Sequence, residues 1–192
     1  MDIFATKIHK VKFPNIELLY RLCKDFVPNL NTNEDFWALN GTNTTFGNRQ
    51  TIHNKFQLRE LVSFVESESE KYWNELGLYN NVRPIIHQSW INVSKKDDSV
   101  LSHMHGNFPM AAVVYLAKEK GSGDIILEHP LDVILGCQPL NDFNKTTKYK
   151  IETETGDVLL FPGYIRHYTL PNTSDSERIV FVCNLGIDRN CI

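Results

Sequence analysis

Three histidines in this chain could together hold a metal ion. His103 and His105 are separated by one residue in the run Ser102-His103-Met104-His105, and His167 follows much later. On an extended segment, residues i and i+2 project to the same face, so both imidazoles can point into one space while Met104 points away. Two nitrogens joined by a distant third leave open positions on an octahedral ion such as iron(II), where further ligands can bind.

The identity of one ligand is open. Facial triads of this kind usually combine two histidines with one carboxylate, and His105 stands where Asp or Glu would be expected. His105 could complete a three-histidine site, or it could stay uncoordinated and leave a position for water or an anion. Histidine pairs with this spacing also occur as ordinary surface or core residues. The aspartates are less plausible replacement ligands because of their positions relative to the pair: Asp97, Asp98 and Asp124.

Arg178 is the second chemical signal, because it begins an otherwise apolar run of Ile, Val and Phe. A buried guanidinium needs an anion, so Arg178 could bind a ligand carboxylate with two parallel hydrogen bonds. Alternatively, it could lie on an edge strand in solvent and pair with Glu177 or Glu152. Tyr115 lies in another apolar run, where its phenol could assist at the same carboxylate or simply pack in the core.

The first part of the chain is predicted to be helical and irregular. A helix is expected from Asn15 to Val27, ending before Pro28, and a second from about Lys55 to Glu75, ending at Gly77. The acidic residues of the second helix are expected on a solvated face. Between the helices, residues 31–50 are rich in Asn, Thr and Gly and predict a long loop.

The second part is predicted to be made of strands. Six segments are short, apolar or alternating, and separated by Gly, Pro or Asn turns: 85–93, 110–116, 124–127, 149–152, 157–161 and 178–185. This pattern indicates a β-sandwich, jelly roll or barrel with helices packed outside. We therefore expect one domain over 1–192, with 1–81 as helical and loop support and 82–187 as the β core.

Bulk properties limit the partners. A formal charge of −3 gives no general attraction to nucleic acid or anionic membranes. No apolar run approaches the roughly 18 residues that span a bilayer, and the first residues lack a signal-peptide pattern, so a cytoplasmic location is expected. The four cysteines form no C-x-x-C pair and are expected to be buried or incidental thiols.

The order of these motifs resembles the 2-oxoglutarate and iron(II)-dependent oxygenase superfamily, specifically an uncharacterised branch found in bacteria and phages. The resemblance covers about residues 84–186. Its long-range order is specific although no single motif is. The segments that carry it are Ser89-Trp90-Ile91-Asn92-Val93, His103-Met104-His105-Gly106-Asn107, Val114-Tyr115-Leu116, Gly121-Ser122-Gly123-Asp124, Gly156-Asp157-Val158-Leu159-Leu160-Phe161-Pro162, His167, Pro171-Asn172 and Glu177-Arg178-Ile179.

The resemblance implies a mainly β fold with flanking helices, namely a double-stranded β-helix of the jelly-roll, cupin-like kind. It implies Fe(II) bound by His103, His167 and the group at position 105. It further implies that Arg178, helped by Tyr115, binds the distal carboxylate of 2-oxoglutarate. Asn92 would contact cosubstrate or substrate, or else be an ordinary sheet residue.

The implied activity is that of a dioxygenase that uses 2-oxoglutarate and O₂, hydroxylates an unidentified substrate and releases succinate and CO₂. Two alternatives remain: a cupin-like metal enzyme that does not use 2-oxoglutarate, and a non-catalytic β-sandwich binding module. Glu128 or His129 could enter the pocket as a substrate contact. Residues 31–50 and 138–148 are candidate lids over the site.

Overall fold

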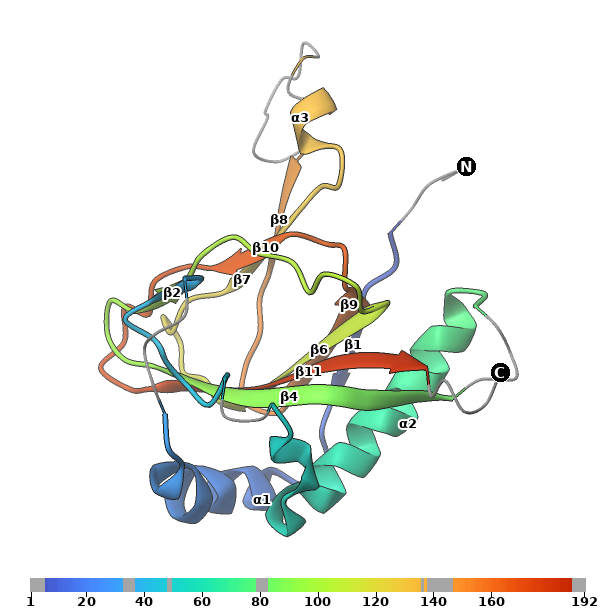
Figure 1. Ribbon diagram of the computed structural model, residues 1–192. Coiled ribbons are helices and arrows are strands. Elements are labelled where there is room, and N and C mark those ends of the chain that lie inside the picture. The colour runs from blue at the N-terminus through green and yellow to red at the C-terminus, as the bar shows by residue number, and fades with distance from the viewer. Residues whose placement is uncertain are drawn as a thin grey trace.

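Antiparallel strands form one large sheet and two small ones (Figure 1). This computed structural model describes residues 6–32, 37–47, 50–78, 83–135, 137 and 147–187. The large sheet contains, in spatial order, β1 (His9–Lys12), β9 (Asp157–Pro162), β6 (Met110–Ala117), β11 (Arg178–Ile187), β4 (Pro84–Ser94) and β3 (Asn43–Thr44). A three-stranded sheet contains β10 (His167–Thr169), β7 (Ile125–Glu128) and β8 (Lys148–Ile151), and β2 (Leu39–Asn40) pairs with β5 (Ser99–Val100).

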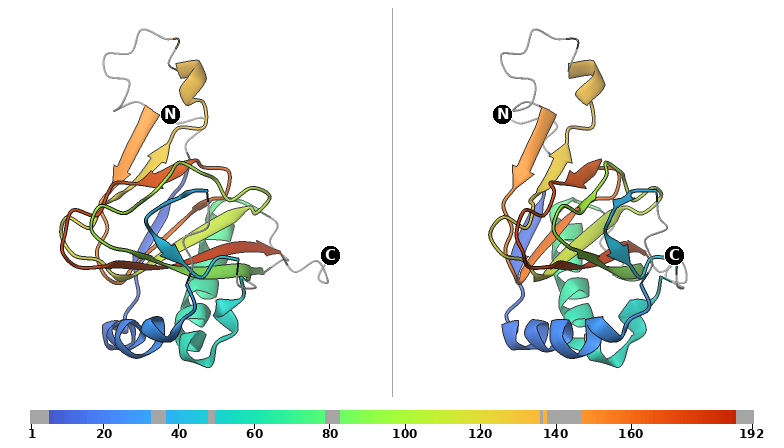
Figure 2. Two further views of the ribbon diagram at one scale, coloured as in Figure 1. Left: turned by 60° about the vertical axis from the view of Figure 1, so that its left-hand side comes forward. Right: turned by 90° about the vertical axis from the view of Figure 1, so that its left-hand side faces the viewer.

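The helices α1 (Ile16–Arg21) and α2 (Arg59–Glu75) cover one face of the large sheet, and the three-stranded sheet lies over the other (Figure 1). Figure 2 shows the same layers from two other directions. The helical elements are α1 (Ile16–Arg21), the π-helical η1 (Leu22–Phe26), the 3₁₀ turns η2 (Val27–Asn29), η3 (Ile52–Asn54) and η4 (Phe56–Leu58), α2 (Arg59–Glu75) and α3 (Asp132–Leu135). None of the described helices is both long and apolar enough to cross a membrane.

The alternation of side chains along β11 separates two cores. Ile179, Phe181, Cys183 and Leu185 belong to the cluster that packs against the helices. Val180 and Val182 belong instead to the cluster between the two sheets, because successive strand residues point to opposite faces. The space between the sheets therefore receives every second residue of β11, beginning with Arg178.

The predicted mainly β fold with flanking helices is confirmed, and all six predicted strands are present as β4, β6, β7, β8, β9 and β11. The loop predicted over residues 31–50 is partly wrong, because it contains β2 and β3. These strands are only two residues long, and their pairing with β5 and β4 rather than their own sequence defines them. The short strands β1, β5 and β10 were not predicted for the same reason.

The helix predictions needed two corrections. The first helical stretch does not end before Pro28, since η2 includes that proline near its start, where the missing N–H costs no hydrogen bond. Glu68 does not lie on a solvated face: it is buried, accepts a hydrogen bond from Lys71 at 2.5 Å and lies 3.1 Å from Nε2 of His9. Gly77 does end α2, with a positive φ of 68°.

We expect the helix-facing side of β11 to carry much of the fold's stability. Phe181 is 0% exposed, so Phe181→Ala should lower the free energy of unfolding by about 3–5 kcal/mol in urea denaturation. Tyr149 is an aromatic strand residue that is 71% exposed, and Tyr149→Ala should cost less than about 1 kcal/mol. Equal losses for the two variants would contradict this assignment of the core.

Candidate active site

A cavity of about 360 Å³ lies between the large sheet and the strands that cover it. Alternate residues of β11 and β4 form one wall, and they face each other in register as Arg178–Ser94, Val180–Asn92, Val182–Trp90 and Asn184–Gln88. The outer two pairs are hydrogen-bonded, with Arg178 Nη2 donating to Ser94 Oγ at 3.1 Å and Asn184 Nδ2 to Gln88 Oε1 at 2.9 Å. The wall is thus polar at both ends and largely apolar between them.

The three histidines meet at this cavity through backbone pairing. His103 and His167 are opposite one another in an antiparallel bridge, and each N–H donates to the other's carbonyl, at 3.0 and 2.9 Å. The N–H of His105 donates to the carbonyl oxygen of Gly163 at 2.9 Å. A Cβ at Gly163 would lie 2.0 Å from the carbonyl oxygen of Phe108, so only glycine allows this close approach.

All three imidazoles present the same nitrogen to the same space. Nδ1 of His103 donates to the carbonyl oxygen of Leu101 at 2.8 Å, and Nδ1 of His167 donates to that of Ile165 at 3.0 Å. Nδ1 of His105 donates to Oδ1 of Asn184. Because these acceptors carry no proton, each Nδ1 must be protonated and each Nε2 must carry a lone pair. Met104, between the first two, was expected to point away from them, but it lines the cavity as well and is 50% exposed.

Burial keeps the histidines neutral. It lowers the pKa of His105 to about 4, holds the pKa of His167 well below its usual value, and lowers the pKa of His103, with mutual repulsion adding to the shifts of His105 and His167. Two uncharged Nε2 atoms, those of His105 and His167, therefore face each other 3.2 Å apart with no proton between them.

A cation would relieve this opposition of lone pairs. One ligand nitrogen from each of the three histidines lies within 4.8 Å of the others. Two cis ligands at about 2.1 Å from an octahedral ion are about 3 Å apart, close to the observed 3.2 Å. The donor set therefore fits a divalent metal such as iron(II), and His105 is brought into the group together with the other two.

Arg178 lies at the other end of the cavity wall and is only 1% exposed. It is therefore not the solvent-exposed edge residue that was one alternative, and none of the ion pairs between described residues joins it to a carboxylate. Nη1 donates to the carbonyl oxygens of Ser122, Gly123 and Leu170, and Nη2 donates to the hydroxyls of Ser94 and Thr169. Ser94 and Thr169 line the cavity whereas the residues that contact Nη1 do not, so Nη2 is the side of the guanidinium that a cavity ligand would reach, where it would share the Nη2 hydrogens with these hydroxyls.

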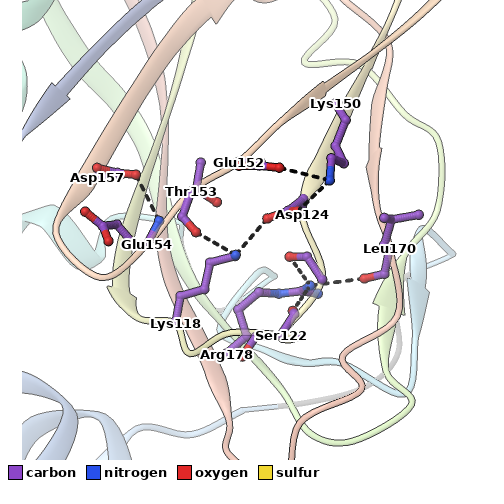
Figure 3. Close-up of polar contacts among 12 residues, drawn as sticks. Lys118, Ser122, Asp124, Lys150, Glu152, Thr153, Glu154, Asp157, Leu170 and Arg178 are labelled. Atoms are coloured by element: carbon purple, nitrogen blue, oxygen red, sulfur yellow. Dashed lines mark hydrogen bonds and ion pairs between the residues drawn. The ribbon is translucent and has the colours of Figure 1, made fainter. Parts of the chain in front are cut away.

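The Gly121-Ser122-Gly123 turn explains how Arg178 is held. Figure 3 shows its guanidinium beside the carbonyl groups of Ser122 and Leu170 and near the ion pair of Lys118 with Asp124. A Cβ at Gly123 would lie 2.6 Å from Nη1 and 2.1 Å from the carbonyl oxygen of Leu170. Glycine is therefore required for the turn to approach the guanidinium so closely.

Tyr115 and Asn92 both line the cavity. Burial raises the pKa of Tyr115 to about 12, against the opposing effect of Arg178, so the phenol stays protonated and can donate. Oδ1 of Asn92 accepts a hydrogen bond from Thr44 Oγ1 at 2.6 Å. The amide NH₂ of Asn92 is thus the part left for a ligand.

Polar residues at the cavity that were missed from sequence include Thr169, Asn184, Gln88 and Ser94. Two of them could have been found from sequence, because residues separated by an even number of positions on a strand face the same side. Thr169 is two residues after His167, and Asn184 is six residues after Arg178. Thr169 Oγ1 accepts from the N–H of Val100 and from Arg178, both at 2.9 Å. With both lone pairs engaged, its own proton can be donated into the cavity.

Other candidates lie elsewhere. Neither Glu128 nor His129 lines the cavity. Glu128 accepts a hydrogen bond from Ser102 Oγ at 2.5 Å and lies 3.5 Å from Arg166. His129 accepts a hydrogen bond from the N–H of Leu131. Asp98 caps its own turn by accepting from Lys95. Of the candidate lids, Phe46 lines the cavity, whereas Phe36 and residues 138–146 lie outside the described residues.

Comparison with known protein families identifies one family. A family model described as "Putative 2OG-Fe(II) oxygenase" matches residues 88–184, while no curated protein matches the sequence. Among solved structures, the non-heme alpha ketoglutarate dependent carbocyclase SnoK from nogalamycin biosynthesis superposes with a TM-score of 0.66 at 15% identity, over 95% of this chain and 80% of that chain.

Two further structures are similar to this chain. HygX from Streptomyces hygroscopicus, with nickel and 2-oxoglutarate bound, gives a TM-score of 0.63 at 12% identity, over 94% of this chain and 83% of HygX. A Pseudomonas putida prolyl-4-hydroxylase gives 0.61 at 12% identity, over 94% and 92%. At these identities the likeness is one of fold, and it confirms the predicted double-stranded β-helix.

The turn at Arg178 gives a matched pair of glycine substitutions. Gly121 and Gly123 both have positive φ, but a Cβ at Gly121 would be no closer than 3.2 Å to the Thr173 hydroxyl, whereas one at Gly123 would strike a backbone carbonyl. Gly121→Ala should therefore cost about 1–2 kcal/mol of unfolding free energy and Gly123→Ala distinctly more. Urea denaturation gives both values, and equal losses would argue against the close packing of the turn on Arg178.

The neutral histidines predict a pH dependence of stability in metal-free protein. Below about pH 6.5 the unfolded chain takes up protons at these residues while the native protein does not, so stability present above that pH is lost on acidification. For His105, with its pKa of about 4, the loss between about pH 6.5 and 5 should be about 1–2 kcal/mol. Urea denaturation with a chelator present measures it.

One variant tests this assignment. His105→Gln should flatten the pH dependence by that amount. A parent protein whose stability is flat from pH 6.5 to 5 would contradict burial of neutral histidines.

Proposed function

The chain belongs to the 2OG-Fe(II) oxygenase family whose model matches residues 88–184, and from that premise we propose a specific activity. The protein is a 2-oxoglutarate- and Fe(II)-dependent dioxygenase that hydroxylates a substrate and releases succinate and CO₂. His103, His105 and His167 hold the iron, and Arg178 anchors the cosubstrate with help from Thr169, Tyr115 and Asn92.

The observation that carries the proposal is the convergence of three unprotonated Nε2 atoms. Each imidazole has its Nδ1 bonded to an acceptor, and two of the lone pairs face each other at 3.2 Å. Ordinary core or surface histidines have no reason to adopt this arrangement. The buried Nε2 atoms lose their hydration, and their lone pairs repel each other without a compensating bond. A metal ion supplies that bond, and the open positions of an octahedral ion leave room for cosubstrate and O₂.

The spacing of the two ends supports a five-carbon diacid as cosubstrate. His167 and Thr169 lie on the same face of β10, about 6.6 Å apart along the strand. Thr169 Oγ1 contacts Arg178 Nη2 at 2.9 Å, so the guanidinium lies beside the strand position two residues after His167. A five-carbon chain spans roughly 5 Å at about 1.5 Å per bond. A diacid of this size can reach from one end to the other.

Charge also supports this assignment. Arg178 is buried without a carboxylate partner among the described residues, and burial lowers its pKa, which marks the cost of an uncompensated cation. A ligand carboxylate would supply the missing anion. The hydroxyl of Thr169 and the protonated phenol of Tyr115 would each donate to it, and the amide of Asn92 would donate further along the wall.

Bound iron and 2-oxoglutarate would supply the oxidising chemistry, in which decarboxylation of the keto acid is coupled to hydroxylation of a substrate C–H bond. The protein's own residues orient the reactants and exclude water. Trp90 stacks on His105 with ring centroids 5.8 Å apart, and Phe46 packs edge-on against Trp90 at 5.0 Å. These rings cover the metal side of the cavity with apolar surface, which limits the access of bulk water.

A cupin-like metal enzyme that does not use 2-oxoglutarate is the second candidate. The donor set favours it, because three neutral nitrogens without a carboxylate are not the usual facial triad. Arg178 separates the two candidates, since only the oxygenase requires a carboxylate at the far end of the cavity. A non-catalytic β-sandwich module requires neither feature.

The test is a set of binding and turnover measurements on the purified protein. Succinate should form only when Fe(II) and 2-oxoglutarate are both present. His103→Ala and His167→Ala should each weaken Fe(II) binding at least 100-fold. Arg178→Met should retain the metal but weaken 2-oxoglutarate binding about 100-fold or more, as expected when one partner of a buried charge pair is removed.

Arg83 provides the control, because it lies on the surface 3.6 Å from Glu70 and outside the cavity. Arg83→Met should bind metal and cosubstrate like the parent. Unchanged 2-oxoglutarate affinity in Arg178→Met would favour the cupin-like candidate, and unchanged iron binding in both histidine variants would refute the metal site.

A further inference from the structure

We infer that Asn184 is a positioning residue that holds His105 in the tautomer whose Nε2 faces the metal, and that Gln88 fixes the amide of Asn184. The inference rests on the proposed metal site. It assigns a role to two residues of the large sheet that contact no other candidate ligand.

His105 differs from the other two histidines in what its Nδ1 contacts. His103 and His167 each donate to the backbone carbonyl two residues earlier, those of Leu101 and Ile165. The equivalent carbonyl for His105 is that of His103, which already accepts the N–H of His167 in the bridge between the two segments. His105 uses a side chain as its acceptor instead, and Asn184 Oδ1 provides it.

A carboxamide can present either its oxygen or its NH₂, so something must set its orientation. Gln88 is the cross-strand partner of Asn184, and its Oε1 accepts from Asn184 Nδ2 at 2.9 Å. With the NH₂ turned toward Gln88, the oxygen of Asn184 faces His105. The hydrogen bonds thus run in one direction, from His105 to Asn184 to Gln88. Gln88, which also lines the cavity, ends the series.

Ring stacking and hydrogen bonding each determine one aspect of the orientation of His105. Trp90 stacks on the imidazole with an interplanar angle of 20°, which fixes the plane of the ring. Stacking does not distinguish Nδ1 from Nε2, because both lie in that plane. The acceptor Asn184, buried and 5% exposed, decides which nitrogen is protonated and which carries the lone pair.

The test compares Asn184→Leu, which removes the acceptor, with Asn184→Asp, which keeps it. Mn(II) affinity, measured from the signal of free Mn(II) in electron paramagnetic resonance, should fall about 10–100-fold in Asn184→Leu and stay within a few-fold of the parent in Asn184→Asp. Gln88→Leu should weaken Mn(II) several-fold, since Asn184 can then turn its amide. Cys183→Ala, the neighbouring helix-facing residue, controls for loss of strand stability and should bind Mn(II) normally.

Nitrogen NMR of the imidazoles in metal-free protein shows which nitrogen of His105 is protonated. This would not change if Asn184 only stabilised the fold. His105 should be protonated at Nδ1 in the parent and in Asn184→Asp, and it should shift toward the Nε2-protonated form in Asn184→Leu. Should Asn184→Leu fail to fold, Gln88→Leu provides the same comparison without touching His105. An unchanged tautomer together with unchanged Mn(II) affinity overturns the inference, as does Asn184→Asp behaving like Asn184→Leu.

The same experiments separate this inference from the proposed function. A parent protein that binds no Mn(II) or Fe(II) refutes the metal site, whereas the tautomer of His105 in the metal-free protein still supports or overturns the role of Asn184.

Discussion

The antiparallel register of β4 against β11 is the constraint on which the rest of the structure depends. It sets Arg178 opposite Ser94 and Asn184 opposite Gln88, with both pairs facing the cavity. A slip of one residue would turn every one of these side chains toward the helices and expose the helix-facing core to the cavity. Irregularities in register lie near both ends of this segment, between Asn184 and Leu185 against β4 and between Ile179 and Val180 against β6. Bulges of this kind often re-aim side chains beside active sites.

The two polar ends of this wall have different partners in the covering strands. At one end, Thr169 of β10 contacts Arg178, and at the other, His105 contacts Asn184. His167, two residues before Thr169 in the chain, is joined to His103 by a backbone bridge. The pairing of β4 with β11 therefore determines where both the proposed metal ligands and the proposed cosubstrate anchor are held, while α1 and α2 cover the opposite face of the same sheet.

The cavity contains an unusual balance of charge. The three histidines are neutral and contribute no negative charge to a bound divalent ion, and Arg178 adds a buried positive charge. A triad with a carboxylate would offset part of the ion's charge within the protein itself. Here the compensation must come from the ligands that complete the site, which favours a dianionic cosubstrate over a neutral one.

Much of this arrangement could be predicted from the sequence, because period-2 alternation is local. It identified the six main strands, paired His103 with His105 and marked Arg178 as an exception in an apolar run. The short strands could not be predicted, since their partners rather than their own residues define them. The acceptors of His103 and His167 are backbone carbonyls, and the carbonyls around Arg178 come from a distant glycine turn. Asn184 has the appearance of an ordinary strand residue until the register places it beside His105.

The most direct test of this account is a crystal structure grown without oxygen in Fe(II) and 2-oxoglutarate. The account predicts an ion about 2.1 Å from the Nε2 atoms of His103, His105 and His167, with the far carboxylate of the diacid at Arg178 Nη2 and the Thr169 hydroxyl. An ion that leaves His105 unbound, or a diacid whose far carboxylate lies away from Arg178, would contradict it.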